Sequence, residues 1–156
     1  MKPKLRFVVA TLGCLVTSQA RLSACECVGP ITPCLAAENA QAVFVGQVVE
    51  ITAAAPPPKG NTTPAAFLAR RVTLKVSESL RGGVDDTVEV YTGNGGGDCG
   101  FNFSKGKSYL VYAHRTTDGP LTTGICARTR EATRGAQGEI NELRALVQEP
   151  RKCRQS

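Results

Sequence analysis

The sequence predicts an all-β fold, a small closed barrel of five strands with helices at its ends, stabilised by disulfide bonds. Three observations support this prediction. Five segments are rich in β-branched and aromatic residues, and two others have helical features. Behind an N-terminal export signal the chain also carries six cysteines, an even number that is typical of a disulfide framework.

The strand predictions come from residue type and from alternation. The segment from Ala42 to Ile51 is mostly β-branched or aromatic, and Gly46 within it indicates a bulge or a close backbone approach. Val72, Leu74 and Val76 alternate with polar residues, which is typical of a half-buried strand. Further strands are expected over residues 87–91, 107–114 and 121–126.

Two helices are expected, one before the first strand and one after the last. Thr32 can cap a short helix that begins at Pro33 and runs through Glu38. Near the C-terminus, apolar residues recur at helical spacing, so we expect a helix that packs one stripe on the sheet. These residues are Ile140, Leu143, Leu146 and Val147.

The first 24 residues read as a signal peptide. Lys2, Lys4 and Arg6 precede an apolar run from Phe7 to Val16, which is too short to span a bilayer, and small residues follow. We therefore expect a signal over residues 1–24 and a single domain over 25–156. The mature protein should be secreted, extracellular and monomeric, with no transmembrane segment.

Removing the signal changes the charge of the protein. Four of the 19 basic residues and none of the 13 acidic residues lie in it, which leaves 15 basic against 13 acidic residues. The net charge falls from +6 to +2, and the remaining basic residues are scattered. With three tyrosines and no tryptophan to stack on bases, nucleic acid is excluded as a partner.

The usual patterns of enzymatic chemistry are missing from the sequence. The one histidine, His114, has no Ser, Cys or Asp arrangement pointing to it, and the glycine run over 93–97 lacks the Lys-Ser or Lys-Thr of a phosphate-binding loop. A thiolate metal site at Cys25-Glu26-Cys27 would need more soft ligands and a reducing compartment. We expect no enzyme activity and no cofactor of its own.

A different chemistry follows if the signal is cut directly before Cys25. The freed α-amine and the carbonyl oxygen of Cys25 can form a five-membered chelate on a metal ion. A catalytic zinc with three protein ligands keeps one position open for water or substrate. The N-terminal chelate would displace that water and stop catalysis, while bridged sulfurs would hold the segment rigid and reduce the entropy lost on binding.

Several segments together form a recognisable pattern. They are the N-terminal Cys25-Glu26-Cys27, the third cysteine Cys34, the strand Val43–Val48, the loop from Tyr91 to Phe101, and the turn at 118–121 before Cys126. In these features the mature chain resembles the inhibitory domain of the tissue inhibitors of metalloproteinases (TIMPs). That domain is a netrin-like module, so the resemblance implies a five-stranded OB-fold barrel. It covers Cys25 to Cys153, without the second domain of the animal inhibitors.

The resemblance also implies a function and a set of contacts. On the residues alone, six cysteines allow 15 pairings. The simplest arrangement bonds each of the three early cysteines to one of the three late ones. The family pattern implies Cys25–Cys99, Cys27–Cys126 and Cys34–Cys153. It implies a secreted inhibitor in which Cys25 chelates the catalytic zinc of a partner metalloproteinase and Glu26 enters its specificity pocket. The flanking contacts would come from Cys27, Val28, Gly96, Gly97 and Asp98.

Glu26 departs from the family, because animal inhibitors carry a small hydroxylated or similar residue there. An unpaired carboxylate is costly to bury in an apolar pocket, whereas a pocket with a basic residue would suit it.

The processing of the N-terminus leaves alternatives open. Cleavage before Cys25 permits chelation. Leu22-Ser23-Ala24-Cys25 also matches a lipoprotein box, in which acylation of Cys25 would anchor the protein in the periplasm or at the outer membrane. Cleavage after Ala20 would leave a short extension. The alternative function is a non-inhibitory netrin-like OB-fold binding module, lipid-anchored if Cys25 is acylated.

Overall fold

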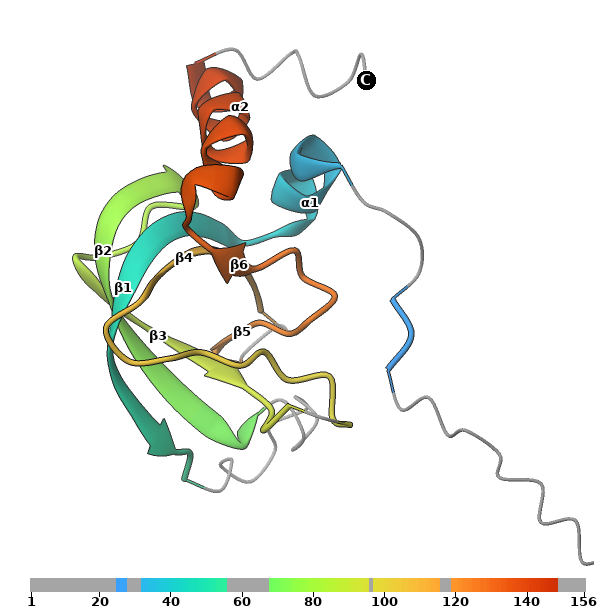
Figure 1. The fold of residues 1–156 in the computed structure, drawn as a ribbon, viewed down its shortest axis with the longest axis vertical. Coiled ribbons are helices and arrows are strands. Elements are labelled where there is room, and N and C mark those ends of the chain that lie inside the picture. The colour runs from blue at the N-terminus through green and yellow to red at the C-terminus, as the bar shows by residue number, and fades with distance from the viewer. Residues whose placement is uncertain (1–24, 28–31, 56–67, 96, 116–118, 149–156) are drawn as a thin grey trace, which may run out of the picture.

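Five strands close a β-barrel in this protein (Figure 1). The computed structural model describes residues 25–27, 32–55, 68–95, 97–115 and 119–148. The barrel strands are β1 (Ala42–Ala53), β2 (Arg70–Arg81), β3 (Thr87–Thr92), β4 (Ser108–Arg115) and β5 (Leu121–Thr122). Their order around the barrel is β1-β2-β3-β5-β4, and β4 pairs back with β1 to close it.

The pairing pattern confirms the predicted OB-like barrel. β3 and β5 run parallel, and the other neighbouring strands of the barrel are antiparallel. A short sixth strand, β6 (Arg130–Glu131), pairs with Tyr109 and Leu110 near the start of β4. Closure of the barrel removes the unpaired lateral edges of the sheet. The loops that connect the strands lie at the two rims of the barrel.

The last barrel strand is shorter than the sequence predicted. The expected strand over 121–126 ends at Thr122, and a turn covers residues 125–128. At the point of departure, the buried Thr123 donates its hydroxyl to the carbonyl of Tyr112 at 2.9 Å. β6 was not predicted, because two residues are too few to show an alternating pattern.

Gly46 has the role that its position in the first strand predicted. The register between β1 and β2 shifts at Val45/Gly46, one of three such irregularities. A Cβ at this position would lie 3.2 Å from the carbonyl oxygen of Lys75 and 3.3 Å from the Cβ of Leu74. The glycine therefore lets the two strands approach closely where the sheet bends to close.

An apolar cluster fills the inside of the barrel. Its members come from all five barrel strands and from the segment before β4. They include Phe44, Val48, Val72, Leu74, Val90, Phe103, Tyr109, Val111 and Leu121.

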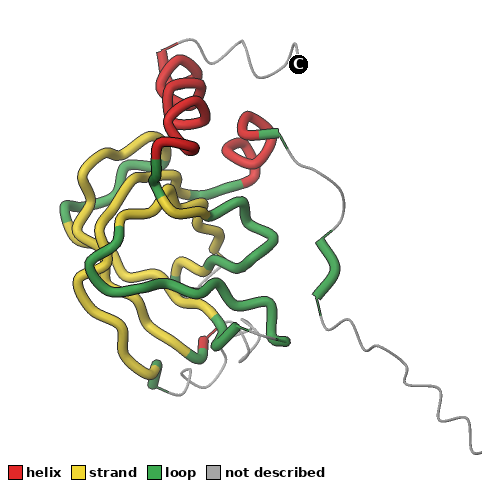
Figure 2. Tube along the Cα trace, viewed as in Figure 1, coloured by secondary structure: helices red, strands yellow, loops and turns green. Residues whose placement is uncertain are grey.

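The two helices lie together on the outside of the barrel, at the top of Figure 1 (see also Figure 2). They are α1 (Pro33–Asn39) and α2 (Gln137–Gln148), the latter preceded by a 3₁₀ turn, η2 (Arg134–Ala136). The expected cap is present, since the Thr32 hydroxyl accepts a hydrogen bond from the Leu35 amide at 3.2 Å. Rather than covering separate ends of the barrel, the helices share one apolar cluster.

This second cluster lies on the outer side of β1 and β4. Val43, Leu110 and Tyr112 point outward from the barrel and pack with Ile140 and Leu143 of α2. β4 is therefore buried on both faces, which explains why its sequence from Tyr109 to Ala113 is continuously apolar rather than alternating. Within the part of the chain described, no helix is both long enough and apolar enough to span a membrane.

Candidate functional site

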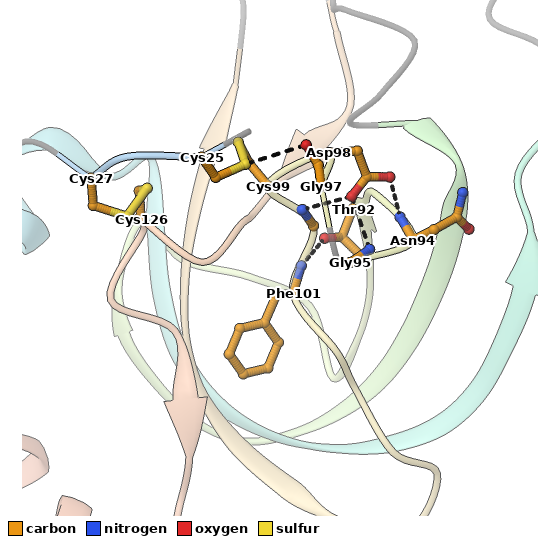
Figure 3. The surroundings of a disulfide bond; sticks show 11 residues. Cys25, Cys27, Thr92, Asn94, Gly95, Gly97, Asp98, Cys99, Phe101 and Cys126 are labelled. Atoms are coloured by element: carbon orange, nitrogen blue, oxygen red, sulfur yellow. Dashed lines mark hydrogen bonds between the residues drawn. A yellow bond between two sulfur atoms is a disulfide. The ribbon is translucent and has the colours of Figure 1, made fainter. Parts of the chain in front are cut away.

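Two disulfides fasten the N-terminal segment to the barrel. Cys25 is bonded to Cys99, with 5.5 Å between the Cα atoms, and Cys27 to Cys126, with 5.3 Å. Figure 3 shows the two bridges next to each other. They are two of the three pairs that the resemblance implies. Cys34 is disulfide-bonded as well, but its expected partner Cys153 lies outside the described residues, so that pair stays a prediction.

The two anchoring cysteines belong to one rim of the barrel. The amide of Ile125 donates to the carbonyl of Cys99 at 3.0 Å, and the amide of Thr123 donates to the carbonyl of Tyr91 at 2.9 Å. The first bond joins the turn after β5 to the loop after β3, and the second joins the residue after β5 to β3 itself. The Cys25–Cys27 segment is consequently attached to two neighbouring loops of the same rim.

Asp98 organises the loop that leads to Cys99. Its carboxylate accepts hydrogen bonds from the backbone amides of Asn94 at 2.6 Å, Gly95 at 2.9 Å and Gly100 at 3.0 Å (Figure 3). These bonds, the one from Asn94 foremost, lower the pKa of the Asp98 carboxyl below its ordinary value. Asp98 therefore holds the loop in its fold through the ionised side chain.

Glycines allow the loop to fold back on itself. Gly95 has a φ of +87°, and a Cβ there would lie 2.6 Å from the side-chain oxygen of Asn102. A Cβ on Gly100 would lie 2.3 Å from the carbonyl carbon of Gly93, so the two ends of the loop touch through their backbones. No larger residue fits at Gly100 without moving the loop.

The loop rests on the barrel through a hydroxyl and a group of aromatic rings. The amide of Phe101 donates to the hydroxyl of the buried Thr92 at 2.8 Å. The rings of Phe101, Phe103 and Tyr109 then stack edge to face, with centroids 4.7–5.7 Å apart. This packing ties the rim to the apolar interior of the barrel.

The described contact residues come together at this rim. Glu26, Cys27 and Gly97 are exposed, while Cys25 is half-buried. The Cys25 sulfur lies 3.6 Å from the Gly97 carbonyl oxygen, and because a bridged sulfur has no proton to donate, this is a packing contact. Of the expected contact residues, Val28 and Gly96 lie outside the described residues.

The structure adds a residue that sequence reasoning missed. Ile125 has 48% of its surface exposed, directly before Cys126 and hydrogen-bonded to Cys99 through its amide. Large apolar residues are ordinarily buried, and nothing in the sequence marked this one as exposed. It gives the rim an exposed apolar side chain next to Cys126 in the chain.

Bridged sulfurs limit the metal chemistry of this site. Cys25, Cys27, Cys99 and Cys126 are all oxidised and so offer no thiolate. Nor do three His, Cys, Asp or Glu side chains gather as potential metal ligands anywhere in the described ranges. The rim therefore exposes the acidic Glu26 on a covalently held segment and the apolar Ile125 on the turn that carries Cys126.

No family model matches the sequence, and a comparison with curated proteins finds no match. The class of protein therefore follows from the structure itself. It is a disulfide-stabilised, OB-like β-barrel with two helices on one side and a doubly tethered segment exposed at one rim.

Proposed function

We propose that this protein is a secreted inhibitor of zinc metalloproteinases that acts through the Cys25-Glu26-Cys27 segment. One observation carries the proposal: Glu26 is exposed between two cysteines that are each bonded to a different loop of the same rim. A segment that is already immobilised loses little conformational entropy when it enters an active-site cleft. Such a segment is suited to tight, rigid binding.

The proposed chemistry uses the backbone of Cys25 rather than its sulfur. After cleavage directly before Cys25, its α-amine and its carbonyl oxygen would bind the protease zinc together and displace the catalytic water. The Cys25–Cys99 bridge removes the thiolate as a competing ligand. The same bridge fixes where the amine stands relative to the rim.

The side chains of the rim supply the proposed selectivity. Glu26 would enter the specificity pocket beside the zinc, and its negative charge favours a pocket that contains a basic residue. Ile125 and Gly97 would contact the protease surface on either side. We propose a monomeric inhibitor that binds one protease molecule outside the cell.

A cleavable N-terminal extension tests the mechanism. One protein is prepared with a removable extension that ends directly before Cys25, and inhibition constants are measured before and after its removal. The free amine should lower the inhibition constant at least about a hundredfold, the scale of a binding hot spot. The uncut protein is its own control, because both forms share the barrel and its disulfides.

The choice of target enzymes sharpens the test. Zinc metalloproteinases with a basic residue in the pocket should be inhibited more strongly than those with an apolar pocket, and Glu26→Gln should reduce the difference. Equal potency with and without the extension would disprove zinc chelation. If the processed protein, verified by the mass of its N-terminus, inhibits none of a broad panel, the non-inhibitory binding module replaces the proposal.

A further inference from the structure

The buried carboxylate of Glu139 is bonded to the turn that carries Cys126. Glu139, in the first turn of α2, has a side chain that is 6% exposed. It accepts hydrogen bonds from Arg128 Nε at 2.8 Å and Nη2 at 3.1 Å, from Arg130 Nη1 at 3.2 Å and from the Tyr112 hydroxyl at 2.6 Å. All of these donors belong to the rim turn or to the strands beside it.

Arg128 is the last residue of the turn and has an unusual backbone conformation. Its φ is +67°, in the left-handed region that residues with a side chain rarely adopt. The bidentate contact with Glu139 therefore fixes a residue whose backbone would otherwise favour another conformation. Cys126, the attachment point of Cys27, lies in the same turn.

The Glu139 carboxylate stays ionised although it is buried. Burial alone would raise its pKa, but the hydrogen bonds from Arg128 and Tyr112 outweigh this effect, and the pKa is lowered. The pKa of the Tyr112 hydroxyl is raised, first by burial and then by its bond to Glu139. At neutral pH the network is thus a negative carboxylate held by two guanidinium groups and a neutral phenol.

Two threonines fasten both ends of the turn to β4. The Thr129 hydroxyl accepts from the Tyr112 amide at 3.0 Å, and the Thr123 hydroxyl donates to the Tyr112 carbonyl at 2.9 Å. The two hydroxyls lie 2.7 Å apart. Tyr112 therefore bonds both flanks of the turn with its backbone, and it bonds the Glu139 carboxylate with its side-chain hydroxyl.

We propose that Arg128 and Glu139 are positioning residues that set the orientation of the Cys126 turn and, through the Cys27–Cys126 bridge, the presentation of Glu26. This inference rests on the proposed function, since it explains how the inhibitory segment is held ready for binding. Without the pair, the turn would be free to leave the left-handed conformation at Arg128. The bridge would then transmit that motion to Cys27.

The molecule contains a matched control on the same helix. Arg144 of α2 makes a bidentate ion pair with Glu78 of β2, with both nitrogen–oxygen distances at 2.6 Å. This pair also joins α2 to the barrel, but it does not involve the turn at 125–128. Glu139→Gln and Glu78→Gln each remove one negative charge from a bidentate pair with little change in shape, and Glu139→Gln also weakens the contacts with Arg130 and Tyr112.

The first experiment needs no protease. Hydrogen exchange of the Ile125 amide, which is bonded to Cys99, and of the Thr123 amide, which is bonded to Tyr91, both report opening of the turn. Glu139→Gln should accelerate both at least about tenfold, while Glu78→Gln leaves them near the wild-type values. Equal effects of the two variants, or none, would overturn the inference.

The second experiment measures the association and dissociation rates of each variant with a metalloproteinase that the wild-type protein inhibits. Glu139→Gln should raise the dissociation rate about tenfold with a smaller change in association, and Glu78→Gln should change neither. Arg128→Lys, which keeps the charge but loses the bidentate contact, should behave like Glu139→Gln and takes its place if that variant does not fold. If even the wild-type protein fails to inhibit, the proposed function fails, and the exchange measurements still decide whether the pair positions the turn.

Discussion

The rim around Cys25–Cys27 and the helical side of the barrel are held by different forces. At the rim, two disulfides and the hydrogen bonds of Asp98 fix a segment whose side chains stay exposed. On the helical side, Ile140 and Leu143 are buried against the outer wall of the barrel. Apolar packing needs side chains to be covered, whereas covalent bridges and backbone bonds leave them open to a partner.

The largest effect on stability is expected from the helical side. Ile140→Ala removes a side chain that is 1% exposed and leaves a cavity, which should lower the free energy of unfolding by about 3 kcal/mol. Denaturant unfolding measures this loss. Val147 was expected on the same packing stripe but is 57% exposed, so Val147→Ala should change the free energy of unfolding by less than about 0.5 kcal/mol. Similar losses for both variants would contradict the assignment of the buried face.

A methyl group at the rim should have a smaller effect that is confined to the loop. Gly100→Ala places a Cβ against the backbone of Gly93 and should cost about 2 kcal/mol, accompanied by amide chemical-shift changes over 93–101. Gly138→Ala in α2 is the control, because a Cβ there meets nothing within 4 Å and should stabilise the helix by about 0.5 kcal/mol. A neutral Gly100→Ala would mean that the two backbones are not in contact.

The smallest effect on global stability is expected from Asp98, whose role is local. Since its pKa in the folded protein lies below the ordinary value of 3.8, its hydrogen bonds contribute fully above that pH and are lost as the pH falls through the lowered pKa. The amide resonances of Gly95 and Gly100 should therefore titrate with a midpoint below 3.8. Asp98→Asn should abolish this titration and accelerate exchange of the same amides. Asp85→Asn, in the exposed loop before β3, should leave both unchanged.

The comparison also shows which features could be predicted from sequence. The strands of the barrel, the Thr32 cap and the close approach at Gly46 each follow from local residue type, because the responsible interactions lie within a few residues or along one strand. The extent of β5 was missed, since Thr123 leaves the sheet to bond the distant Tyr112. The site segment was predicted from its cysteines, but neither the exposure of Ile125 nor the Arg128–Glu139 pair had a sequence signal.

By itself, the sequence determined the segments that form strands and helices, the cysteines available for a disulfide framework, and Glu26 as an acidic residue between two of them. Those properties follow from backbone preferences and from the spacing of residues close together in the chain. The resemblance implied which late cysteines pair with Cys25 and Cys27, but only the tertiary structure decided that both helices share the outer wall of β1 and β4 and that Glu139 reaches Tyr112. The physical reason is that barrel closure brings together residues far apart in the sequence, and no local pattern encodes which of them will meet.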